Sequence, residues 1–141
     1  MTPTLLGRIQ TRWLLLLLVG VPWVLVFSPF LLLFTDASLA TVYDLGFVSL
    51  LLVGLLGTGW ELIYHLLMQL RWEKDWPTLF GLVTAINEFV VLVLVLYALD
   101  YNEFVPVLLL FFSLWLWMWL VSNGPLRVLL PRWRYRGGRV L

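Results

Sequence analysis

Four polar residues stand out because they lie within otherwise apolar stretches of the chain: Glu61, His65, Asn87 and Glu88. Carboxylates and imidazoles carry protons, hold cations and ligate metals, so this group is a candidate site. An ionisable residue inside a membrane costs about 2.5–3.5 kcal/mol to insert as a charge, and it usually faces a partner or a cavity. The chemistry open to the four depends on whether the segments that carry them bring them together.

The composition predicts that these segments span a membrane. The chain is 62% hydrophobic and 12% charged, whereas a soluble domain is about 45–50% apolar and about 25% charged. It contains no cysteine, which excludes a disulfide-stapled secreted module. A membrane helix needs roughly 20 apolar residues, and four stretches qualify, at 13–34, 45–70, 77–99 and 104–121. We expect one all-α transmembrane domain over 1–141, an up-down antiparallel bundle of four helices with a basic interfacial tail at 122–141.

The basic residues predict the orientation. All nine fall on one face of such a bundle: Arg8, Arg12, Arg71, Lys74, Arg127, Arg132, Arg134, Arg136 and Arg139. The charged residues of the loops on the other face are all acidic: Asp36, Asp44, Asp100 and Glu103. Basic residues stay in the cytoplasm, so both termini are expected there, in an inner or plasma membrane. Pro22 and Pro29 should bend the first helix or split it near Ser28.

Helical spacing predicts that the polar residues converge. One face of the second helix carries Gly54, Gly57, Thr58, Glu61, His65 and Met68, and one face of the third carries Gly81, Thr84, Ala85 and Glu88. Small residues let membrane helices approach closely, so these two faces are expected to pack tightly together. Glu61 and Glu88 lie at similar distances from the connecting turn, and therefore at similar depth. We expect a Glu61–His65–Glu88 cluster flanked by Asn87 and Tyr64.

Three hypotheses compete for this cluster. It is a polar clamp that fixes helix register, or a proton or cation relay, or a metal site in which Glu61-x-x-x-His65 and Glu88 hold zinc, iron or manganese. The relay hypothesis has few polar residues to use beyond Glu88, and the metal hypothesis has a spacing that departs from the known di-metal bundle pattern. The sequence does not identify a cofactor, and the chain has no phosphate-binding loop, HExxH, CxxC or nucleophile elbow.

Two further features suggest surfaces. Trp115, Trp117 and Trp119 form an aromatic surface on the fourth helix, for a partner or for interfacial anchoring. The arginines of the tail alternate with apolar residues and should contact anionic lipid; they are Arg127, Arg132, Arg134, Arg136 and Arg139.

Taken together, the sequence favours a small non-catalytic membrane protein, an accessory or scaffolding subunit. Its expected partners are the lipid bilayer and other membrane subunits or further copies of the chain, and not nucleic acid. The alternatives are a proton- or cation-handling protein and, third, a membrane metal- or cofactor-binding protein.

Overall fold

Four helices in the described part of the chain are long and apolar enough to cross a membrane. The computed structural model describes residues 4–70 and 78–139, with the side chain of Arg134 excepted. Runs of this length become helical in lipid because each backbone N–H and C=O must find its partner within the segment. The described residues do not include Arg71, Lys74 and Pro77. The expected orientation depends in part on the first two, and the expected start of the third span depends on Pro77.

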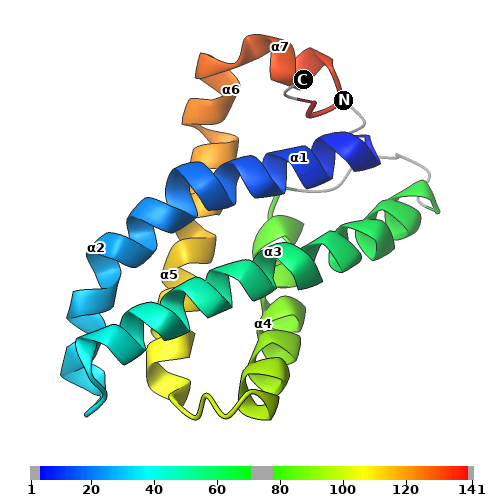
Figure 1. Cartoon of the computed structure of the whole chain (residues 1–141). Coiled ribbons are helices and arrows are strands. Elements are labelled where there is room, and N and C mark those ends of the chain that lie inside the picture. The colour runs from blue at the N-terminus through cyan, green and yellow to red at the C-terminus, as the bar shows by residue number, and fades with distance from the viewer. Residues whose placement is uncertain (1–3, 71–77, 140–141) are drawn as a thin grey trace.

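The first candidate span covers 5–34 and is built from four consecutive pieces: α1 (Leu5–Leu15), the π-helical η1 (Leu16–Gly20), α2 (Val21–Leu31) and the 3₁₀ turn η2 (Leu32–Phe34). It starts eight residues before the expected position, because Thr4 caps it by accepting the Gly7 N–H at 3.2 Å. Of the two outcomes expected from Pro22 and Pro29, a bend or a split near Ser28, the split does not occur, since α2 continues through Pro29. The irregular turn lies before Pro22, which has no N–H for a regular helical bond, and the ribbon bends there (Figure 1).

The other long helices are α3 (Leu39–Gln69), α4 (Phe80–Ala98) and α5 (Phe104–Asn123). α3 begins six residues earlier than predicted because the Ser38 hydroxyl caps it. α4 ends at a turn in which Asp100 has φ +66° and the Tyr101 N–H bonds the Leu96 carbonyl at 2.9 Å. After α5, the short helices α6 (Pro125–Leu129) and α7 (Pro131–Tyr135) lead to the C-terminus.

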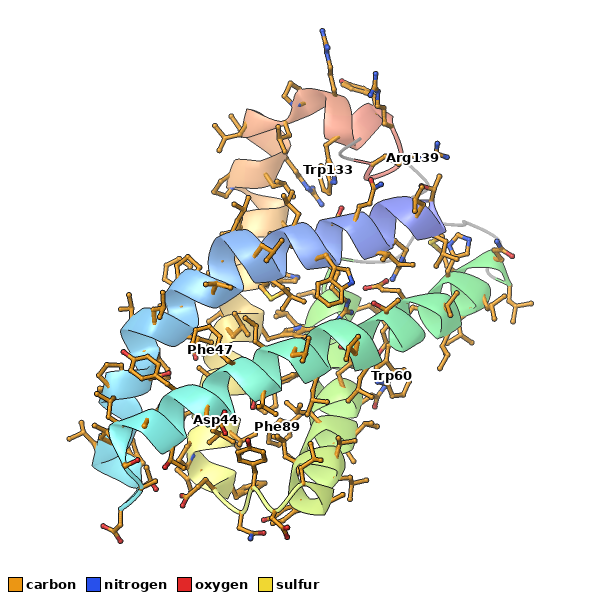
Figure 2. The ribbon with its side chains drawn as sticks, in the orientation of Figure 1. Asp44, Phe47, Trp60, Phe89, Trp133 and Arg139 are labelled. Carbon is orange, nitrogen blue, oxygen red and sulfur yellow. The ribbon has the colours of Figure 1, made fainter. Side chains whose placement is uncertain are left out.

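The long helices form two hairpins that cross each other (Figure 1). α1 and α2 pack along α3, α4 packs along α5, and α3 and α5 each also contact the other hairpin. We call the end with both chain termini the terminal end, and the end with the α2–α3 and α4–α5 connections the loop end. Figure 2 shows Trp133 and Arg139 at the terminal end, whereas Asp44 and Phe89 lie toward the loop end.

The core between the hairpins is aliphatic toward the loop end. The side chains that are most deeply buried there are Leu31, Val42, Leu45, Leu92, Leu96 and Leu110. Phe89 of α4 adds ring contacts with Phe104, Phe111 and Phe112 of α5, at 5.0–6.0 Å between centroids. Many Leu, Val and Phe side chains point outward, as a surface in contact with lipid requires.

Candidate functional site: a buried arginine between two glutamates

Arg12 of α1 is the centre of the polar site. Its guanidinium is 7% exposed, and it bonds Glu61 of α3 and Glu88 of α4 at once. Nη1 and Nη2 donate to the two Glu88 oxygens at 2.7 and 2.9 Å, and Nη2 and Nε donate to Oε1 of Glu61 at 2.8 and 3.1 Å. Such forked contacts use the planar geometry of guanidinium and carboxylate, and lysine does not reproduce them.

Arg8 completes the charge balance. It lies one helical turn before Arg12, and its Nε donates to the remaining Glu61 oxygen at 2.6 Å. All four carboxylate oxygens of Glu61 and Glu88 therefore accept at least one guanidinium N–H. Two arginines and two glutamates sum to zero charge, so the group can be buried without leaving an unpaired ion. We call Arg8, Arg12, Glu61 and Glu88 the charge cluster.

Glycines on α3 allow α1 to come close enough for this contact. A Cβ built on Gly57 would lie 2.2 Å from Nη1 of Arg12, and one built on Gly54 would lie 2.6 Å from the ring of Trp13. The Trp13 Nε1–H also donates to Thr58 at 3.2 Å. Arg12 therefore lies directly on the bare backbone of α3 and reaches across it to α4.

Trp115 joins the remaining long helix to the cluster. Its ring centroid lies 5.4 Å from the Arg12 Cζ, a cation–π distance. Its Nε1–H donates to the Gly81 carbonyl of α4 at 2.7 Å. Arg12 thus contacts residues of α3, α4 and α5 from its position on α1.

The structure brings some of the sequence-predicted residues together and separates others. Glu61 and Glu88 meet at one guanidinium, with buried Tyr64 one turn from Glu61, but His65 pairs with Gln69 at 3.0 Å between Nε atoms. Asn87 lies on the exposed side of α4. Within residues 4–70 and 78–139, no three His, Cys, Asp or Glu residues are arranged to hold a metal ion. The geometry therefore gives the metal hypothesis no support.

The expected close pairing of small residues between α3 and α4 needs correction. Gly54 and Gly57 face α1, and Gly81 faces Trp119 of α5, with a built Cβ 3.2 Å from its ring. Thr58 bonds Trp13, Thr84 bonds the Gly81 carbonyl within its own helix, and Ala85 is buried in the core. The three glycines serve close packing, but they receive the large side chains of α1 and α5 rather than each other.

Trp115 and Trp119 are also used within the molecule. The Trp119 Nε1–H donates to the Thr78 carbonyl at 3.0 Å, and Trp115 bonds Gly81 as described. Trp117 is 45% exposed and touches Trp23 of α2, with 5.6 Å between ring centroids. The aromatic surface left for a partner is therefore smaller than the sequence suggests.

The C-terminal tail packs on the face of α1 that points away from the charge cluster. The Gly137 carbonyl accepts the Thr4 N–H at 2.9 Å, the Gly138 carbonyl accepts the Thr11 hydroxyl at 3.0 Å, and Trp133 donates to Thr11 at 2.8 Å. Figure 2 shows Trp133 and Arg139 beside this part of α1. We call this contact the tail latch; it holds in place the helix that carries Arg8 and Arg12.

Sequence reasoning missed Arg12 because it placed Arg8 and Arg12 in a loop before the first span. A signal was present in the charge count, because Glu61 and Glu88 together need two cations and these two arginines are four residues apart. Comparison of the chain with protein-family models, with curated proteins and with solved structures found no match in any of the three. The site is therefore interpreted from its own geometry.

Proposed function

We propose that this chain is a non-catalytic, multi-pass protein of an inner or plasma membrane, which acts as an accessory or scaffolding subunit beside larger membrane partners. The observation that carries the proposal is the closed hydrogen bonding of the charge cluster, in which every carboxylate oxygen of Glu61 and Glu88 accepts a guanidinium N–H. Polar groups committed in this way fix the arrangement of helices rather than handle a ligand.

The same closure speaks against the proton- or cation-relay alternative. A relay needs carboxylate oxygens that can exchange a proton or ion with water or with the next group along a path. Here both acids are held by arginine, which keeps its proton throughout the physiological range. Further along α4, the residues from Phe89 to Leu96 are all apolar and offer no next group.

The proposed topology is an up-down bundle with both termini in the cytoplasm. It is supported by the asymmetry of the charges, since the connections at the loop end carry acids and no basic residue. The chain has no native cysteine, so in a single-cysteine variant the introduced thiol is the only one that a maleimide can label. We expect Ser38→Cys to react with a membrane-impermeant maleimide on intact cells, and Val128→Cys to react only after permeabilisation; the reverse pattern would overturn the orientation.

The tail is proposed to rest on anionic lipid headgroups. Among the described side chains, Arg127, Arg132, Arg136 and Arg139 are exposed and make no ion pair. Val128 and Tyr135 are exposed beside them, at 78% and 84%. Each arginine near an anionic surface contributes about 1 kcal/mol. Native mass spectrometry should show retained phosphatidylglycerol, which decreases in an Arg132→Gln/Arg136→Gln variant and is unchanged in Leu6→Gln.

The accessory role is tested by isolating the tagged protein from its own membranes in mild detergent. We expect it in a complex of defined mass that contains other membrane proteins. Reconstituted alone into vesicles loaded with a pH-sensitive dye, it should raise proton flux no more than vesicles without protein do. Flux that is lost on Glu88→Gln, in protein whose helical content is unchanged, would overturn the proposal in favour of the relay.

A further inference from the structure

One face of α4 carries exposed residues at alternating spacings of three and four. The row consists of Phe80, Val83, Asn87, Val90, Leu94 and Tyr97, and all of them are exposed. This alternation is the a/d pattern of a coiled coil, in which one seam of each helix faces the partner. The opposite face of α4 supplies Glu88 and Leu92 to the interior. We call the exposed row the α4 seam.

Asn87 makes this seam different from an ordinary lipid-facing surface. It lies two residues before Phe89, the middle residue of the 19-residue helix, and therefore close to the centre of the span. Tyr64 of α3 is near enough to interact with its amide. An amide has two N–H donors and two acceptor lone pairs, so this one neighbour within residues 4–70 and 78–139 leaves most of that capacity unused. Exposed amide groups in hydrocarbon are unfavourable, which calls for a polar partner at this depth.

We propose that the α4 seam is the interface of a homodimer, in which α4 packs against α4 of a second copy in parallel. Copies inserted in the same direction hold their Asn87 residues at the same depth, on either side of a two-fold axis along the membrane normal. Each amide N–H can then donate to the carbonyl of the other. In this register Phe80, Asn87 and Leu94 occupy a positions, and Val83, Val90 and Tyr97 occupy d positions.

Polar complementarity selects a second copy over other occupants. The described part of the seam carries no charge, so a charged partner gains nothing there, and lipid tails offer no hydrogen bond. A different protein would need its own polar residue at the depth of Asn87, whereas a second copy supplies one by symmetry. A single asparagine at an a position is also a known determinant of register in parallel coiled coils. The inference rests on the proposed membrane insertion, but not on the accessory role.

Disulfide trapping tests the phase of the interface. We expect single Val83→Cys, Val90→Cys and Leu94→Cys variants to form a disulfide-linked species of twice the chain mass in native membranes under mild oxidation. Leu55→Cys on α3 and Val26→Cys on α2 are matched controls, because their side chains are 56% and 74% exposed but lie off the seam. Equal trapping at the control positions, or no trapping on the seam, would overturn the homodimer.

The amide contact is tested by substitution in the intact chain. Lipid offers no hydrophobic drive for helices to associate, so Asn87→Leu should weaken dimerisation about 3- to 20-fold, the range that measured interhelical polar contacts represent. Asn87→Gln should retain more of the affinity, because it keeps the amide. Energy transfer between labelled copies in vesicles at varied lipid-to-protein ratio measures both variants. Unchanged association in Asn87→Leu would remove the amide from the interface and overturn the inference.

The two proposals fail separately. If the seam cysteines link to a different protein of constant mass, the homodimer is wrong and the accessory role gains support. If they link two copies and the isolated complex contains no other protein, the homodimer stands and the accessory role is wrong.

Discussion

The two ends of the molecule hold their helices together by different means. At the loop end, Val42, Leu45, Leu96 and Leu110 form an aliphatic core, each no more than 2% exposed. On the side of the terminal end, Arg12 is also buried, at 7% exposed, but it makes directed hydrogen bonds to two other helices. Leucine packs against lipid as well as it packs against leucine, whereas a guanidinium in a membrane needs its partners. We infer that the aliphatic end supplies close packing and the charged end fixes the register.

The largest effect should come from removing the central cation. Arg12→Leu leaves Glu61 paired only with Arg8, and it leaves Glu88 with no partner among its described contacts. Breaking one partner out of a buried ion pair costs about 3–5 kcal/mol, so we expect the free energy of unfolding in bicelles, measured by steric trapping, to fall by about that amount. Leu45→Ala at the loop end should lower the free energy of unfolding by less. When the helices separate in a membrane, the leucine moves from the core into lipid, which is equally apolar.

Neutralising the acids as well separates lost charge balance from lost packing. The triple variant Arg12→Leu/Glu61→Gln/Glu88→Gln removes the unpaired carboxylates and should recover a substantial part of the stability lost in Arg12→Leu. A triple variant no more stable than Arg12→Leu would show that packing, not charge, distinguishes the terminal end. Equal costs for Arg12→Leu and Leu45→Ala would remove the contrast between the two ends altogether.

Two nearby glycines of α3 provide the next test. Gly57→Ala places a Cβ 2.2 Å from Nη1 of Arg12, whereas Gly59 has nothing within 4 Å of a built Cβ. We expect Gly57→Ala to cost about 1–3 kcal/mol through overpacking. Gly59→Ala should instead stabilise by up to about 1 kcal/mol, because alanine favours helix. The SDS-induced unfolding midpoint should therefore shift in opposite directions; shifts of the same sign would contradict the close approach of α1 to α3.

The sequence predicts the spanning helices better than it predicts their contacts. Hydropathy identifies four apolar segments because lipid admits little other than helix over such lengths. The start of the first helix at Leu5 is harder to predict from hydropathy. It depends on the Thr4 cap, and the turns that follow contain Arg8 and Arg12, whose side chains point toward the interior. The π-helical turn before Pro22 is also hard to predict from the sequence. A proline indicates that the helix is irregular nearby, but it does not indicate which residues adopt the irregular turn.

The sequence predicts the relative depth of the two glutamates of the candidate site, but not the helix that joins them. Counting residues from a hairpin turn gives the relative depth of Glu61 and Glu88, because helical rise is constant. It does not say which helix lies between them, and α1 takes that place because Gly54 and Gly57 leave room for Trp13 and Arg12. His65 is only four residues from Glu61, but its side chain points toward Gln69.

The tail latch should contribute a smaller effect than either change near Arg12. Gly137 has φ +66°, where a residue with a Cβ is strained by about 1–2 kcal/mol, and its built Cβ would lie 2.9 Å from Thr4. We expect Gly137→Ala to increase hydrogen exchange of the first turn of α1, because it loosens the carbonyl that bonds the Thr4 N–H. Leu129→Ala, at a 75% exposed position of α6, is the control. Unchanged exchange in Gly137→Ala would mean that α1 is held by the charge cluster alone.

The smallest effect is expected at the surface of the loop end, where the Tyr101 hydroxyl donates to Asp44 of α3. This hydrogen bond raises the pKa of Tyr101 above its usual value, with a further contribution from the nearby negative charge. A raised pKa means that the folded state favours the neutral phenol, so the stabilisation is complete below about pH 10. It is lost as the pH rises through the folded-state pKa.

Tyr101→Phe should flatten the decline of the unfolding midpoint at alkaline pH, whereas Tyr135→Phe on the exposed tail should leave it unchanged. If Tyr101→Phe instead lowers stability as much as Gly57→Ala, then directed polar contacts fix the register at both ends. The two ends would then differ only in how deeply their polar contacts are buried.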